Sequence, residues 1–121
     1  MSESSVAKFA AGLLHAVTKG HMMHLQSRSF AQHMALGDFY EGIEDLADSF
    51  IEAYQGNYGI IESYPNGFTV PGDDALIELI DFSEFVKAGR KQVPQDSELQ
   101  NIIDEIQALA DSTLYKLRFL A

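Results

Sequence analysis

Residues 96–119 carry the most regular apolar pattern in the chain, and this pattern restricts the fold to one built from packed helices. Apolar side chains recur there at steps of three and four residues, which places them along one side of an α-helix. A stripe of this kind has to be buried against other elements of the fold. The stripe consists of Leu99, Ile102, Ile103, Ile106, Leu109, Ala110, Thr113, Leu114 and Leu117, and Leu120 continues it one step beyond.

Three further segments show helical periodicity, and the predicted helices are 4–27, 30–55, 73–91 and 96–119. Ser29 followed by Gln32 fits a capping box at the start of the second helix, and Asp73 or Asp74 caps the third. Glycines and prolines are frequent in residues 56–72, which predicts a long loop. The expected fold is therefore all-α, a four-helix bundle with one long connection, in a single domain over residues 1–121.

Charge and composition exclude several classes of function. The net charge is −10, and the eight Lys and Arg residues are scattered, so direct nucleic-acid binding is not expected. No apolar run approaches the roughly 20 residues of a membrane span, so no membrane association is expected. The first residues lack the basic and apolar regions of a secretory signal, and the chain has no cysteine. These features favour a cytoplasmic protein.

A row of carboxylates follows one side of the predicted helix 30–55. With about 100° of rotation per residue and His33 as zero, the apolar residues of this helix cluster near roughly 310°. Glu41, Asp45, Asp48 and Glu52 lie between about 60° and 120°, so this row faces away from the bundle. Either the row is an ordinary solvated face, or it provides oxygen ligands that together with imidazole would suit divalent iron, manganese or zinc.

The four histidines all lie in the first third of the chain, at positions 15, 21, 24 and 33. On the first helix, the angular positions of His21 and His24 continue the buried seam, whereas His15 points elsewhere. Two interpretations remain open for this pair: hydrogen-bonded core side chains, or metal ligands.

A family resemblance links these residues. The run from His24 to His33, continued through Asp48-Ser49-Phe50-Ile51-Glu52 to Gln55-Gly56, resembles the first two helices of the mini-ferritins, the DNA-binding proteins from starved cells. In that family an aspartate follows the second histidine by fifteen residues, and a glutamate follows four residues later. Gly37 stands here where the family often has another carboxylate.

The resemblance implies an iron site between two subunits, with His24 and His33 from one copy and Asp48 and Glu52 from the other. The outward direction of the row agrees with this arrangement. The expected protein is a homodimer or larger homo-oligomer that binds iron, or manganese or zinc in its place, and that oxidises ferrous iron if it is active. Whether it is an enzyme stays open at this stage.

The alternative is a non-enzymatic phage or bacterial interaction protein on a ferritin-like bundle with a vestigial site. The segment Tyr115-Lys116-Leu117-Arg118-Phe119-Leu120 resembles short uncharacterised proteins of tailed bacteriophages, which would place the protein in the host cytoplasm. Loop 56–72 would then be the contact for a protein partner. No histidine follows His33, so the intramolecular di-iron site with two Glu-x-x-His motifs is excluded. Phosphate-binding and nucleophile-elbow motifs are absent as well.

Overall fold

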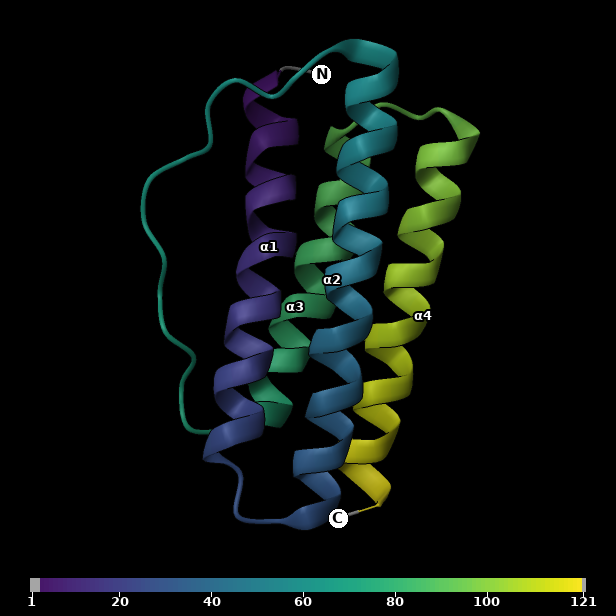
Figure 1. Ribbon diagram of the computed structural model, residues 1–121. Coiled ribbons are helices and arrows are strands. Elements are labelled where there is room, and N and C mark those ends of the chain that lie inside the picture. The colour runs from purple at the N-terminus through teal and green to yellow at the C-terminus, as the bar shows by residue number, and fades with distance from the viewer. Residues whose placement is uncertain (1–2, 121) are drawn as a thin grey trace.

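Four α-helices make up the described part of the chain, residues 3–120, in the computed structural model (Figure 1). They are α1 (Glu3–Gln26), α2 (Phe30–Tyr58), α3 (Ala75–Gly89) and α4 (Ser97–Phe119), with a single 3₁₀ turn, η1 (Arg90–Gln92), after α3. The predicted all-α four-helix bundle is confirmed. The largest difference is that α2 continues three residues beyond the predicted end.

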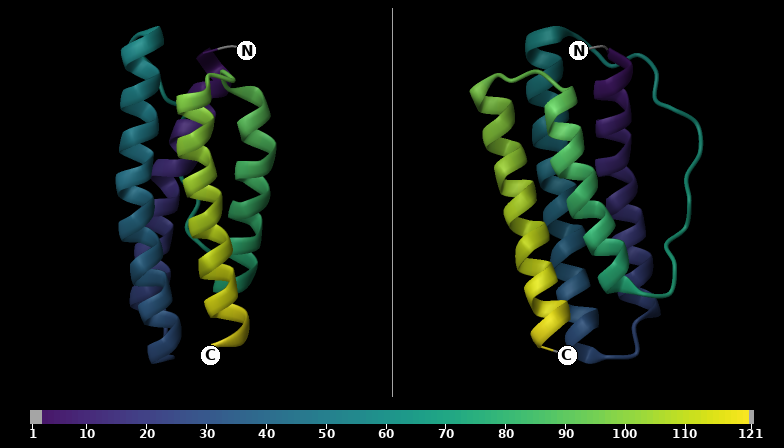
Figure 2. Two further views of the ribbon diagram at one scale, coloured as in Figure 1. Left: turned by 90° about the vertical axis from the view of Figure 1, so that its right-hand side faces the viewer. Right: turned by 180° about the vertical axis from the view of Figure 1, so that it is seen from behind.

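The helices do not follow one another around the bundle in chain order. A short turn joins antiparallel α1 and α2, and residues 59–74 then cross the whole length of the bundle outside α1 before α3 begins (Figures 1 and 2). Because of this crossover, α2 and α3 run in the same direction. Helix α2 packs against α1 and α4, and α4 packs against α3, whereas α1 and α3 touch each other much less.

The ends of the helices follow from local hydrogen bonding. Asp74 is the N-cap of α3, and its carboxylate accepts hydrogen bonds from the backbone N–H groups of Leu76 (3.0 Å) and Ile77 (3.3 Å). Helix α2 ends at Gly59, whose φ of 101° is open to glycine and strained for other residues. The predicted stop at Gly56 is therefore three residues early, because Gly56 is still helical.

Hydrogen bonds hold the end of α2 and the first residues of the crossover in place. The Tyr58 hydroxyl donates to Asp96 (2.6 Å), the Asn57 amide donates to the same carboxylate (3.0 Å), and Ile61 N–H donates to the Gln55 side chain (2.9 Å). The hydrogen bond to Asp96, desolvation and the charge of that carboxylate raise the pKa of Tyr58 above its ordinary value of 10.0. Asp96 precedes α4, so these bonds join the α2 end to the α4 start.

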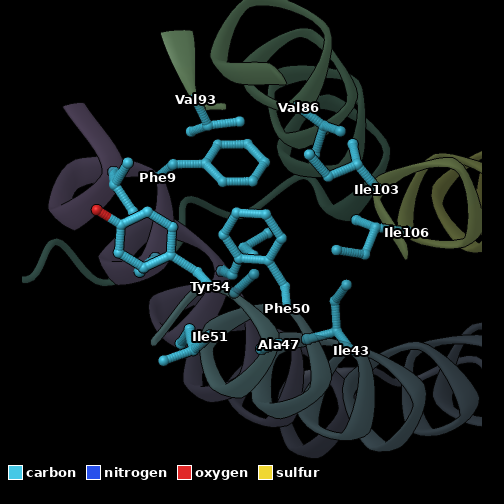
Figure 3. Packing of buried hydrophobic residues seen from close by; sticks show 14 of the residues in the cluster. Phe9, Ile43, Ala47, Phe50, Ile51, Tyr54, Val86, Val93, Ile103 and Ile106 are labelled. Carbon is cyan, nitrogen blue, oxygen red and sulfur yellow. The ribbon is translucent and has the colours of Figure 1, made fainter. Parts of the chain in front are cut away.

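Phe9 is buried in the core, where its ring faces those of its neighbours (Figure 3). Its ring meets Phe50 edge to face at 5.3 Å and stacks on Phe85 at 5.5 Å. A β-carbon at Gly12 would lie 2.1 Å from the Phe85 ring, and one at Gly89 would lie 2.4 Å from Phe9. These glycines therefore let the two rings lie directly on helix backbones. No helix within residues 3–120 is long and apolar enough to cross a membrane.

Candidate functional site

The turn between α1 and α2 brings the ends of the two helices together. The Ser29 hydroxyl accepts a hydrogen bond from Gln32 N–H (3.3 Å), which is the first half of the predicted capping box. The second half differs from the prediction, since the Ser29 N–H donates to the Ser27 hydroxyl (3.3 Å). With only residues 27–29 between the helices, His24 near the end of α1 faces His33 near the start of α2.

His24 and His33 form a reciprocal pair across the two helices. Nδ1 of His24 lies 2.6 Å from the carbonyl oxygen of His33, and Nδ1 of His33 lies 2.8 Å from the carbonyl oxygen of His24. The rings stack with their centroids 3.7 Å apart and their planes 19° from parallel. Because a carbonyl oxygen can only accept, each Nδ1 has to carry the proton. In the neutral form, each Nε2 therefore keeps its lone pair.

The histidine pair also supplies a hydrogen-bond donor to a carbonyl group at the end of α1. The last four carbonyl groups of a helix have no partner within that helix. The carbonyl of His24 is one of these four, and the imidazole of His33 donates to it. The interaction is therefore structural, and it also fixes the tautomer of each imidazole.

Gly37 leaves room for the ring of His24. A β-carbon at position 37 would lie 3.1 Å from both Cε1 and Nδ1 of His24, which is a tight contact. The glycine therefore lets the His24 ring lie against the backbone of α2 at this turn.

His21 differs from its predicted position. The periodicity placed it near the buried seam, but it is exposed, and its ring stacks on Tyr40 at 4.3 Å. Its ring lies 6.2 Å from that of His24, which in turn lies 5.4 Å from Tyr40. His24 is half-buried, as expected. The aromatic group of His21, His24, His33 and Tyr40 was not predicted, although His33, Gly37 and Tyr40 recur at helical spacing in the sequence.

The carboxylates of the predicted site lie farther along α2. Asp48 and Glu52 are exposed, as are Glu41 and Asp45, so the predicted outward direction of the row is confirmed. At 1.5 Å per residue, Asp48 lies about 22 Å along the helix from His33, and Glu52 about 28 Å. Within residues 3–120 of one copy, no group of three or more histidines and carboxylates is placed to hold a metal ion. A metal site shared between two copies stays a prediction.

Comparison with known proteins gives one match. The model of a family of unknown function, DUF5856, matches residues 24–117. The chain belongs to this family. The matched part contains the histidine pair, the carboxylate row and the crossover. No curated protein and no solved structure matches the chain, so no ferritin-like relative was found.

Proposed function

We propose that this DUF5856 chain is a ferritin-like metal-binding protein that holds iron, or manganese or zinc in its place, between two copies. His24 and His33 of one copy and Asp48 and Glu52 of the other would be the ligands. The proposal depends mainly on one observation, that both histidines donate Nδ1–H to backbone carbonyls. Metal-binding histidines are commonly held in this way, with Nε2 left for the ion.

The topology supports the proposal. A four-helix bundle with a single long crossover is the arrangement of ferritin-like folds, which build metal sites from inward and interface carboxylates and histidines. Here residues 59–74 form the single crossover. Imidazole nitrogen combined with carboxylate oxygen is a donor set suited to divalent iron, manganese and zinc.

Geometry requires the second copy. His33 lies on the same helix as the two carboxylates, but it is about 22 Å or more away from them along the helix axis. If two α2 helices lay antiparallel with a twofold axis near residue 41, His33 of one copy would come level with Asp48 and Glu52 of the other. A twofold dimer makes two such sites at once.

The bound ion would supply charge neutralisation and, for ferrous iron, the capacity for one-electron oxidation. The protein would contribute the neutral imidazoles and the carboxylates that balance the charge of the ion. Without the ion, four exposed carboxylates at helical spacing repel each other by a few tenths of a kcal/mol per pair. Metal binding would remove this repulsion and stabilise the dimer.

The test is thermal unfolding with and without ferrous iron under anaerobic conditions, on the wild type and on Asp48→Asn/Glu52→Gln. A metal at 100 times its Kd stabilises the folded state by about 2.7 kcal/mol. We expect the wild type to melt at a higher temperature with iron and the double variant to show no shift. Glu105→Gln, an exposed carboxylate of α4, is the matched control. Absence of a shift and of copurifying metal in the wild type would refute the metal site.

A second candidate is a non-enzymatic interaction protein, favoured by the exposed apolar side chains at the α1–α2 turn and the end of α4. Phe30 and Phe119 are 78% and 72% exposed, and Leu25 is 67% exposed. Exposed apolar groups gathered at one end often mark a protein contact. If the chain is monomeric and binds no metal, this candidate replaces the first, and the end of the bundle and loop 56–72 become the surfaces to test for partners.

A further inference from the structure

A cleft separates α1 from α3 next to the contact between the Phe85 ring and Gly12. Its volume is about 420 Å³, within the range of small-molecule sites. Thr69 and Val70 of the crossover are among the residues that line it. The crossover itself passes outside α1 (Figures 1 and 2). The cleft exists because α1 and α3 pack directly only over a small part of their length.

The floor of the cleft is apolar. Met23, Phe39 and Leu79 are almost fully buried beneath it, and Phe82 is half-buried beside them. The small side chain of Ala16 leaves space on the α1 side. Water over such a floor has few hydrogen-bonding partners, so an apolar group of a ligand would displace it favourably.

The two walls carry opposite charges. Lys19 lies on α1, whereas Glu78 and Asp81 lie on α3. Lys19 and Glu78 are both half-buried, and neither belongs to an ion pair among the described residues. Charges of both signs therefore face one apolar cavity without neutralising each other across it.

The crossover is held over this cavity by an aromatic contact. The His15 ring meets the Phe68 ring edge to face at 5.2 Å, next to Thr69 and Val70. This contact gives the cleft a cover on the side where α1 and α3 leave it open.

We propose that the cleft binds a small zwitterion with an apolar body, namely an apolar amino acid. Its carboxylate would pair with Lys19, its ammonium group with Glu78 and Asp81, and its side chain would lie on the floor around Phe82. Charge-assisted hydrogen bonds to the carboxylate and to the ammonium group, which share one carbon atom, fix the orientation, and the half-buried positions of Lys19 and Glu78 strengthen them relative to water. Neither His24 nor His33 lines this cleft, so the proposal does not depend on metal binding.

The test is calorimetric titration of the full chain with L-phenylalanine and L-leucine, and with two analogues that each lack one charge. We expect both amino acids to bind, and 3-phenylpropionate and phenethylamine to bind at least tenfold more weakly. Lys19→Gln should weaken L-phenylalanine binding at least tenfold, whereas Lys91→Gln, an exposed cation of η1, should leave it unchanged.

Ala16→Leu supplies an independent measurement, because the larger side chain would fill the floor and abolish binding of both amino acids. Folding of each variant is checked by its thermal unfolding curve. If neither amino acid binds the folded wild type, the proposal is wrong. Equal affinity for phenethylamine and L-phenylalanine, or unchanged binding by a folded Lys19→Gln, would also overturn it.

Discussion

Single residues at the α1–α2 turn decide the geometry of the histidine pair. His33 supplies the partner that the His24 carbonyl lacks at the end of α1, and Gly37 leaves room for the ring of His24. The resemblance to the mini-ferritins predicted that His24 and His33 belong together, as histidines at the end of one helix and the start of the next. It could not predict their reciprocal hydrogen bonds, which depend on side-chain rotation across two helices.

Gly37→Ala should stabilise the protein less than Gly56→Ala. Replacing a helical glycine by alanine gains roughly 0.5–1 kcal/mol. A β-carbon at Gly56 meets no atom within 4 Å, so the full gain is expected there. At Gly37 the new methyl group would press on His24 at 3.1 Å and offset the gain. Urea unfolding gives the two free energies, and an equal gain at both positions would contradict the tight contact.

At the scale of the elements, periodicity predicted all four helices, whereas the end of α2 depended on a contact with a residue distant in the sequence. Gly56 and the loop composition pointed to an early end of α2. The helix continues because Tyr58 and Asn57 donate hydrogen bonds to Asp96. For Tyr58, this partner lies 38 residues later in the sequence. A pattern among neighbouring residues of the sequence cannot predict such a contact. The choice between Asp73 and Asp74 as cap was likewise open until the hydrogen bonds were seen.

Asp74→Ala should therefore cost stability, whereas Asp73→Ala should not. Loss of an N-cap side chain typically costs about 1 kcal/mol. Asp74 accepts two backbone hydrogen bonds at the start of α3, and Asp73 is an exposed neighbour that does not cap the helix. Denaturant unfolding of the two variants gives the comparison. A larger loss for Asp73→Ala would mean that the cap is assigned to the wrong residue.

The link between Tyr58 and Asp96 should make part of the stability depend on alkaline pH. The folded-state pKa of Tyr58 is raised above 10.0, so its contribution is fully present below pH 10 and is lost as pH rises through the raised pKa. Tyr58→Phe should lower the melting temperature at pH 7, and the difference from the wild type should shrink above pH 10. Tyr64→Phe, at an exposed position of the crossover, is the control. A difference that is independent of pH would contradict this account.

At the scale of the whole molecule, charge and apolar surface are unevenly distributed. Helix α2 carries six carboxylates and no Lys or Arg, and all six are exposed. Arg28, Lys116 and Arg118 lie instead at the end of the bundle where the exposed apolar side chains gather, and Lys116 pairs with Asp38 at 3.7 Å. In an antiparallel dimer, this basic and apolar end of one copy would meet the acidic half of α2 of the other. Complementary charges favour such an encounter.

Phe30→Ser/Met34→Ser should therefore convert the proposed dimer into a monomer. Phe30 is 78% exposed and Met34 49% exposed, so the substitutions should change the stability of a single chain by no more than about 0.5 kcal/mol each. Light scattering after size exclusion should give twice the chain mass of 13.4 kDa for the wild type and the single mass for the variant. Ile77→Ser on α3, at a position 53% exposed, should leave the dimer intact.

The same variant tests whether the metal site needs two copies. Since His33 and Asp48 of one chain lie about 22 Å apart along α2, a monomer cannot bring them to one ion. The monomeric variant should therefore lose the thermal shift with ferrous iron, although His24, His33, Asp48 and Glu52 are all unchanged. Retention of the full shift by a monomer would show that the ion is bound within one chain and that the carboxylate row takes no part in binding it.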